Sequence, residues 1–273
     1  MAKTKVLIAV KTYPTLASKY DELVCTAGFR EDGTWVRIYP IPFRKLDYDK
    51  QYKKYDWLEI DLVRNDKDFR PESYRPYSID KAFDIVGHID TNNNWELRKE
   101  IVLKNVYTSL DKLIADAKDN KKHTSLAVFK PTTIHDFICK PTDREWDKTK
   151  LANLKAKALQ LNLFANSDNP FDVVNKLPYE FSFVFSDNMG RRSTLMIEDW
   201  ETGQLFWNCL KNHDGDEQKA CMDVKKKYFD DFAKTKDLHF YLGTTRQFHL
   251  ISPNPFIIIG TFHPKKEDQL KLF

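Results

Sequence analysis

Residues 23–39 read LVCTAGFREDGTWVRIY, two apolar segments on either side of a turn signal. Residues 23–29 and 35–39 are rich in β-branched and aromatic side chains, which favour strands. Asp32 and Gly33 lie between them and supply the left-handed backbone that a tight turn requires. The stretch therefore predicts a β-hairpin, and this hairpin indicates that the N-terminal half is built around a sheet.

Further strands and helices are expected on both sides of the hairpin. In the N-terminal half we predict strands at residues 4–10, 57–63, 82–89, 126–129 and 134–138 and two helices within 95–120, and the last two strands could close the first sheet into a small barrel. In the C-terminal half we predict a hairpin at residues 181–185 and 193–197, strands at 238–242 and 256–262, and helices at 151–164, 200–210 and 216–234.

A polar stretch with one proline, residues 140–150, divides these two groups of elements. The sequence thus predicts an α+β chain, mostly β, with two OB-like small β-barrels decorated with helices. We place an N-terminal OB-like barrel with helices at residues 1–145. A β-rich, barrel-like domain with helices follows at residues 146–264, and residues 265–273 form a flexible tail.

Composition narrows the class of protein. The chain has 273 residues, of which 41% are hydrophobic and 31% charged, as in globular proteins. No apolar run approaches the roughly 20 residues of a membrane helix, and no signal peptide is visible, so we expect a cytoplasmic, nucleoid-associated protein without membrane contact. The four cysteines form no CxxC pair or Cys/His cluster, and we predict no metal, no cofactor and no disulfide framework.

The last five residues form a short peptide, QLKLF. This peptide resembles the QLxLF sequence by which bacterial polymerases and repair proteins dock on the ring-shaped β sliding clamp. Such a peptide inserts two apolar side chains into a pocket while its glutamine bonds at the rim. The alternative is an edge strand, because the apolar residues alternate at period two. The partner-binding residues that we predict are Gln269, Leu270, Leu272 and Phe273.

Cations and aromatic rings alternate through residues 35–57, and residues 68–77 repeat the pairing of arginine with an aromatic ring. Single-strand binders hold phosphates with cations and stack bases on rings. The alternative is that the rings pack a core and the lysines only solvate the surface. For phosphates we predict Arg37, Arg44, Lys45, Lys53, Lys54, Arg70 and Arg75, and for base stacking Tyr39, Phe43, Tyr52 and Tyr74.

Two short segments carry a family resemblance. They are residues 23–28, which follow Thr12-Tyr13-Pro14, and residues 33–40, GTWVRIYP. In this pattern the chain resembles bacterial proteins described as carrying a dual OB-fold domain, whereas its aromatic extension at residues 39–44 departs from it. The resemblance implies two oligonucleotide-binding-type barrels and a role in DNA maintenance or in defence against mobile elements.

Together these features predict a non-enzymatic protein that binds single-stranded or partly opened DNA and is recruited to the sliding clamp. Catalysis stays open, because a metal-dependent nuclease at the clamp could use Glu198, Asp199 and Glu201, or the pair Glu59 and Asp61. A third alternative keeps the clamp peptide and makes the barrels a protein-interaction scaffold in a defence complex. Its partners would be other defence or repair proteins.

Overall fold

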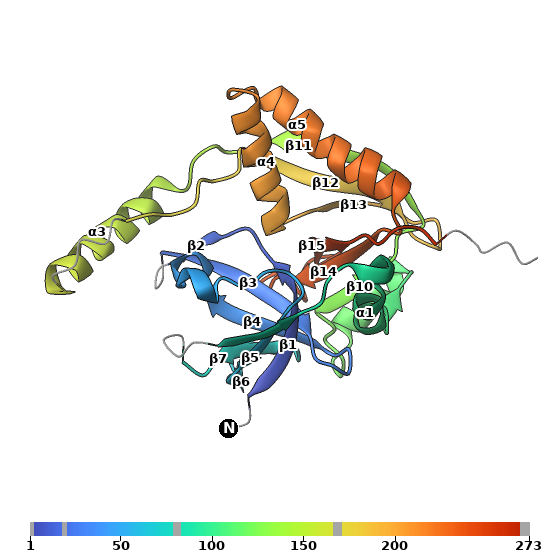
Figure 1. The fold of residues 1–273 in the computed structure, drawn as a ribbon, viewed down its shortest axis with the longest axis horizontal. Coiled ribbons are helices and arrows are strands. Elements are labelled where there is room, and N and C mark those ends of the chain that lie inside the picture. The colour runs from blue at the N-terminus through green and yellow to red at the C-terminus, as the bar shows by residue number, and fades with distance from the viewer. Residues whose placement is uncertain (1–2, 18–20, 79–82, 166–170, 268–273) are drawn as a thin grey trace, which may run out of the picture.

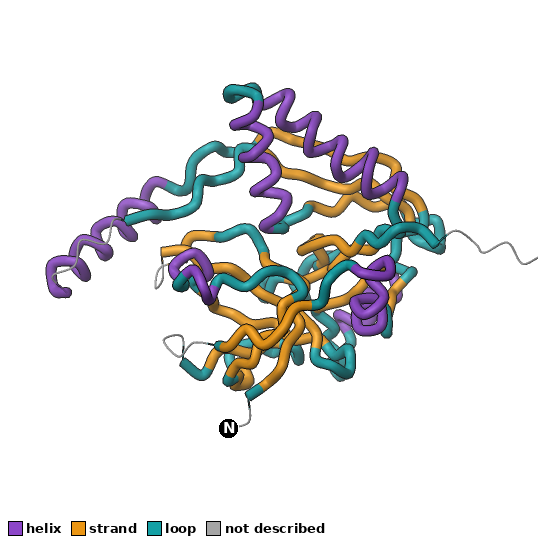
Figure 2. The backbone as a smooth tube through the Cα atoms, viewed as in Figure 1, coloured by secondary structure: helices purple, strands orange, loops and turns teal. Residues whose placement is uncertain are grey.

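The computed structural model describes residues 3–17, 21–78, 83–165 and 171–267. Across these residues the chain is α+β, with more strand than helix (Figure 1). One sheet is curled into a half-barrel, and two smaller sheets are open. Figure 2 shows the curled sheet on one side of the molecule, the helices α4 (Trp200–Asn212) and α5 (Glu217–Lys225) on the opposite side, and strands between them.

The curled sheet contains the predicted hairpin. Phe29 pairs with Trp35 across the turn, where Gly33 has a φ of 84° and the Asp32 carboxylate accepts a hydrogen bond from the Thr34 amide. The strand order is β6-β7-β4-β3-β1-β5-β8, with β2 paired to β3, and only β4 and β7 run parallel. The strands are β1 (Thr4–Lys11), β2 (Thr15–Ala17), β3 (Asp21–Phe29), β4 (Trp35–Ile41), β5 (Asp56–Ile60), β6 (Leu62–Arg64), β7 (Ser73–Pro76) and β8 (Asp84–His88).

Two open sheets complete the β structure. One has the order β15-β14-β10-β9, from β9 (Val106–Tyr107), β10 (Leu126–Phe129), β14 (His239–Thr244) and β15 (Phe256–Phe262). The other has the order β11-β12-β13, from β11 (Thr133–Pro141), β12 (Tyr179–Ser186) and β13 (Arg192–Met196). A single bridge between Ile197 and Ile258 joins these two sheets at their edges.

This topology corrects one expectation. We expected residues 126–129 and 134–138 to close the first sheet into a barrel. Both segments are strands, but β10 pairs with β14 and β11 pairs with β12, so each belongs to a sheet completed by the C-terminal half. Their sequences predict strands correctly, whereas strand pairing depends on contacts with residues about 40 to 120 positions away.

The helices cover the open sheets or extend from them. The first two helices are α1 (Asn92–Val102) and α2 (Leu110–Lys118). Helices α4 and α5 lie against the three-stranded sheet in Figure 1. A wider π-type segment, Lys226–Ala233, continues α5, and α3 (Lys148–Ala165) projects away from the body. Within the described residues, no helix is long and apolar enough to cross a membrane.

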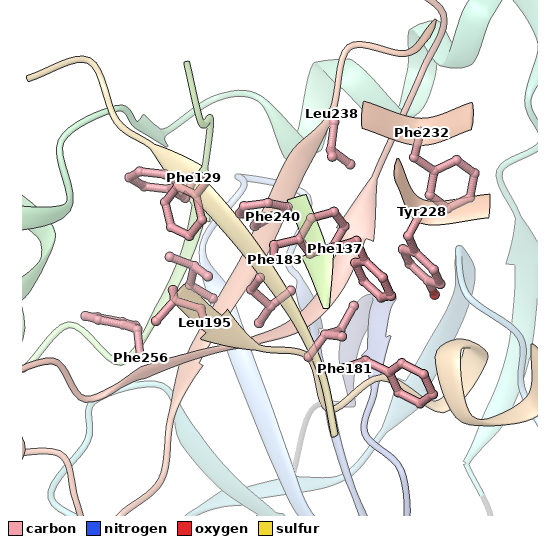
Figure 3. Close-up of a cluster of buried hydrophobic side chains, with 14 of the residues drawn as sticks. Phe129, Phe137, Phe181, Phe183, Leu195, Tyr228, Phe232, Leu238, Phe240 and Phe256 are labelled. Atoms are coloured by element: carbon pink, nitrogen blue, oxygen red, sulfur yellow. The ribbon is translucent and has the colours of Figure 1, made fainter. Parts of the chain in front are cut away.

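Aromatic side chains fill the largest core. Phe137, Phe181 and Phe183 of the three-stranded sheet meet Phe240 of β14 and Tyr228 beside α5 (Figure 3). A second core joins the curled sheet to the four-stranded sheet, and a third lies within the curled sheet. Because the second core spans two sheets, the two halves of the chain are held against each other by apolar burial.

Gly203 in α4 sets how closely this helix approaches the N-terminal half. A Cβ placed on Gly203 would lie 2.3 Å from Cδ2 of Tyr13, whose hydroxyl donates to the Asn175 carbonyl and accepts from Trp207 Nε1. We expect Gly203→Ala to lower the free energy of unfolding by about 1–3 kcal/mol, measured by urea denaturation, because the ring cannot yield without losing these bonds.

Gly87→Ala is the matched control for this prediction. A Cβ on Gly87 in β8 would meet nothing closer than 3.8 Å, so this variant should stay within about 0.5 kcal/mol of the unchanged protein. Equal stability of the two variants would show that α4 does not depend on this close approach.

Candidate functional site

A cleft of about 620 Å³ lies where the curled sheet, α1, α4 and the end of β15 meet. Its size is within the roughly 300–1,000 Å³ range of small-molecule sites. Four cations line it together with three aromatic rings, one exposed carboxylate and two histidines. These residues are Lys11, Lys53, Lys54, Arg98, Tyr55, Trp95, Trp200, Glu201, His88 and His263.

Lys54 is the best-paired cation of the cleft. Its Nζ donates to Asp199 Oδ2 at 3.1 Å and to Glu201 Oε2 at 2.8 Å, and the Asp199 side chain is fully buried. Burial alone would lower the pKa of Lys54, but the two carboxylates outweigh it and raise this pKa. Burial also raises the pKa of Asp199, whose Oδ1 has no hydrogen-bond partner among the described residues.

Lys11 ends β1 inside the cleft wall and is only 7% exposed. Its Nζ donates to the Tyr52 carbonyl oxygen at 3.0 Å and lies 4.2 Å from the centre of the Phe43 ring. Within the described part of the chain, no carboxylate oxygen lies within 4 Å of this ammonium group. Burial, reinforced by repulsion from Lys54, lowers the pKa of Lys11 to about 8.

Arg98 is the second buried cation without a carboxylate partner. Its Nε and Nη2 both donate to the Ile89 carbonyl oxygen, at 2.9 and 2.6 Å. The guanidinium carbon lies 3.7 Å from the centre of the Tyr55 ring and 4.9 Å from that of Trp95, so cation–π contacts fix the plane of the group. Nη1 has no hydrogen-bond partner among the described residues, and the Arg98 side chain lines the cleft.

Trp95 reaches the cleft from an unusual turn at the start of α1. Asn93, Asn94 and Trp95 have φ values of 49°, 53° and 67°. This is a left-handed backbone conformation that residues other than glycine rarely adopt. The Asn94 side chain accepts a hydrogen bond from the Lys265 amide at 2.7 Å and donates to the Lys265 carbonyl at 3.0 Å. The turn therefore positions Trp95 in the cleft and also holds residues 264–267, which we call the stem of the C-terminal tail.

His263 closes the wall between the cleft and that stem. Its ring stacks on Phe232 at 3.7 Å and meets the edge of Trp95 at 5.0 Å. Burial, together with the positive charge of Lys54, lowers the pKa of His263 to about 3, so this imidazole is neutral at physiological pH. The ion pair between Lys99 and Glu267 fixes the stem, residues 264–267, against α1. A backbone hydrogen bond from the Asp237 amide to the Pro264 carbonyl and a bridge between Lys236 and Lys265 hold it to the residues before β14.

Five of the predicted nucleic-acid residues are buried and hold the fold together. Arg37 donates to Ser125 Oγ at 2.7 Å, Arg70 pairs with Asp68, and the fully buried Tyr52 shares a hydrogen bond with Thr26. We therefore leave these buried side chains out of the surface proposed below, with the exception of Lys54, which lines the cleft. The five are Arg37, Phe43, Tyr52, Lys54 and Arg70.

The remaining predicted residues are not gathered at one place. Lys53 is exposed on the rim of the cleft. Tyr39 is 41% exposed and lies on β4 beside the β7 strand that carries the exposed Arg75. Lys45 forms an ion pair with Asp21, Arg44 pairs with Glu22 and Asp172, and the half-buried ring of Tyr74 lies under the Arg30 guanidinium.

The predicted clamp-binding residues Gln269, Leu270, Leu272 and Phe273 lie outside the described residues. The carboxylates considered for a nuclease are described. Asp199 and Glu201 both hold Lys54, and Glu198 is half-buried with a pKa raised by burial. An ammonium group thus occupies the position that a cation would take between Asp199 and Glu201 in this conformation.

Most residues that line the cleft could not be identified from the sequence. Lys11 follows an entirely buried apolar run, and a lysine directly after such a run is the one local signal that could have drawn attention to it. Trp95, Arg98 and Trp200 carry no comparable signal, because each occurs in an ordinary helical pattern. They meet only because the curled sheet brings α1 and α4 to one place.

The comparisons with known proteins cover the chain in two parts. Residues 2–104 match the family described as domain of unknown function DUF8758, and residues 106–273 match the family described as domain of unknown function DUF8757. No curated protein matches the chain. Because the second family model spans more than half of the chain, the protein belongs to the DUF8757 family, with a DUF8758 domain preceding that region.

Proposed function

We propose that this protein binds single-stranded or partly opened DNA in the cleft and docks on the β sliding clamp through Gln269–Phe273. The observation that carries the proposal is the shared wall between the cleft and the stem of the tail. Trp95 and His263 line the cleft, while their neighbours Asn94 and Lys265 hold each other through two hydrogen bonds. A clamp peptide leaving from Glu267 would therefore hold the cleft close to the clamp.

The chemistry of the cleft supports a nucleic-acid ligand. Four cations line the cleft together with one carboxylate, Glu201, and the buried Asp199 pairs with Lys54, so the local charge favours an anion. Half-buried Trp95 and Trp200 offer ring faces on which bases of any sequence can stack. This combination of cations and rings is typical of proteins that bind single strands without sequence preference.

The proposed biological setting follows from the resemblance to dual OB-fold proteins. In this proposal the curled sheet is an oligonucleotide-binding-type unit, and the second such unit is formed by the C-terminal half. The protein would act in DNA maintenance or in defence against mobile elements, within the nucleoid and by binding rather than by catalysis. The engagement of Asp199 and Glu201 by Lys54 favours binding over a nuclease activity at these carboxylates.

Lys53→Ala tests the cleft as the DNA site. Lys53 is exposed on the rim, so its removal should leave the fold intact while taking away one phosphate contact. We expect weaker binding of a single-stranded oligonucleotide and a salt dependence of log K that is shallower by roughly 0.7, measured by fluorescence anisotropy at several salt concentrations.

Lys118→Ala is the matched control, because Lys118 is an exposed lysine on α2 that does not line the cleft. It should keep both the affinity and the salt slope. Equal effects of the two variants would indicate diffuse attraction to the whole surface, and no binding by the unchanged protein would remove DNA as the ligand.

A further inference from the structure

Two cations of the cleft are unusual because they are buried without a carboxylate partner. Lys11 is 7% exposed and Arg98 is 6% exposed. Taking a charged group out of water is costly, and proteins normally compensate with an opposite charge. The nearby carboxylates of Asp199 and Glu201 hold Lys54 instead. The cleft thus contains positive charge that the described residues leave without a direct counter-charge.

Both cations line the cleft and also have donors that form no hydrogen bond to a described residue. Lys11 Nζ makes one hydrogen bond within the described chain, to the Tyr52 carbonyl oxygen, out of the three that an ammonium group can donate. Arg98 uses Nε and Nη2 on the Ile89 carbonyl oxygen, while Nη1 has no partner among the described residues. The Tyr55 and Trp95 rings fix the guanidinium plane, so this donor is oriented before a ligand arrives.

On the footing of the proposed nucleic-acid function, we infer that the cleft holds the end of a strand by a terminal phosphomonoester, with Lys11 and Arg98 as its counter-charges. A phosphomonoester carries about −1.5 to −2 charges at neutral pH, whereas each internal phosphodiester carries one. Two unpaired buried cations match the terminal group better than the internal one. The aromatic walls, Trp95 and Trp200, would contact the base of the same terminal nucleotide.

The volume of the cleft agrees with a single nucleotide unit. At about 620 Å³ it accommodates one nucleotide together with water, but not a long stretch of strand. Exposed Lys53 lies on the rim, where the next phosphate of the strand would pass. The buried cations would therefore bind the terminal phosphate of the strand, and Lys53 on the rim would contact the phosphate of the next nucleotide.

The test compares ends that differ only in phosphate. Oligonucleotides of about 12 nucleotides with a 5′-phosphate, a 3′-phosphate or two hydroxyl ends are titrated with the full chain, and dAMP and deoxyadenosine are used as competitors. We expect one phosphorylated end to bind at least about tenfold more tightly than the hydroxyl ends, since each charge-assisted bond is stronger than a neutral one. The oligonucleotide that binds most tightly identifies which end of the strand enters the cleft. dAMP should compete with this oligonucleotide for binding, whereas deoxyadenosine should not.

Lys11→Met should remove this preference at neutral pH, whereas Lys118→Ala should keep it. The preference of the unchanged chain is measured without any variant, so a poorly folded Lys11→Met protein does not weaken the test. Equal affinity for all three oligonucleotides would overturn the inference and leave DNA binding itself intact. Binding of dAMP without binding of any oligonucleotide would support the phosphate site and overturn the proposed DNA function. Failure of every phosphorylated ligand to bind would overturn both.

The pH dependence gives a second readout. Burial lowers the pKa of Lys11 to about 8, and the phosphomonoester is a dianion above about pH 6. The ammonium form that binds phosphate is therefore lost as pH rises through 8, so the end preference should fall between about pH 8 and 9.5, and Lys11→Arg should abolish that fall. A preference that stays constant over this range in the unchanged chain would contradict the role of Lys11. The charged and titratable groups that face Lys11 or line the same cleft are Tyr52, Lys53, Lys54, Tyr55, Asp56, His88, Arg98, Asp199, Glu201 and His263.

Discussion

Replacing Lys54 with methionine is expected to lower the free energy of unfolding by about 3–5 kcal/mol, the usual cost of removing one partner from a buried ion pair. The Asp199 side chain is fully buried, and its Oδ1 already lacks a partner among the described residues. Without Lys54, its Oδ2 would lose its ammonium donor as well. Methionine fills a similar volume, so the loss would come from the unpaired charge rather than from a cavity.

Urea denaturation of Lys54→Met and of its neighbour Lys53→Met measures this effect. Lys53 is exposed and should tolerate the same substitution within about 0.5 kcal/mol. The double variant Lys54→Met/Asp199→Leu should recover most of the lost free energy of unfolding, because it removes the carboxylate that Lys54→Met leaves without a partner. Equal stability of Lys54→Met and Lys53→Met would contradict the assignment of Lys54 as the buried partner of Asp199.

The loss in Lys54→Met should also depend on pH. Burial raises the pKa of Asp199 to about 7 even beside Lys54, and without Lys54 only a backbone hydrogen bond from Glu201 opposes this rise. A carboxyl whose folded pKa lies above its unfolded value destabilises the fold increasingly as pH rises between the two values. The deficit of Lys54→Met should therefore be smaller at pH 5 than at pH 8.

Removing residues 269–273 is expected to weaken binding to a bacterial sliding clamp by at least about a hundredfold, because two buried apolar anchors commonly supply most of the energy of such an interface. Affinity for single-stranded DNA should not change, since none of the cleft residues belongs to this segment. Surface plasmon resonance against immobilised clamp measures the first quantity and fluorescence anisotropy the second.

Lys271→Ala is the matched control for the truncation, because position 271 is the unspecified position of the QLxLF pattern. It should bind the clamp within about threefold of the unchanged chain. If the unchanged chain does not bind the clamp and the truncation instead lowers the unfolding free energy, the five residues form a packed edge strand, which is the alternative that their period-two alternation leaves open.

The local elements of this fold could be predicted from the sequence because their signals are local. The hairpin of β3 and β4 follows from two apolar segments around Asp32-Gly33, and the second hairpin, β12 and β13, follows in the same way. The pairing of β10 with β14 could not be predicted. The two strands lie more than 100 residues apart, and neither sequence specifies its partner.

The candidate site was harder to predict, since composition does not tell which way a side chain faces. Lys53 and Lys54 are adjacent in the same basic tract, yet one is exposed and the other is buried against Asp199. Arg37 appears in the tract as a phosphate ligand, but it lies on the inward face of β4 and bonds to Ser125 instead. The unpaired cations Lys11 and Arg98 become visible only when their surroundings are known.

The central claim is that DNA lies in the cleft, and photo-cross-linking tests it most directly. A single-stranded oligonucleotide containing 5-iododeoxyuridine is irradiated with the full chain, and the cross-linked residues are identified by mass spectrometry. We predict cross-links at Trp95 and Trp200, the two half-buried rings of the cleft. Cross-links confined to exposed rings outside it, such as Tyr39, Phe69 or Tyr77, would contradict the account.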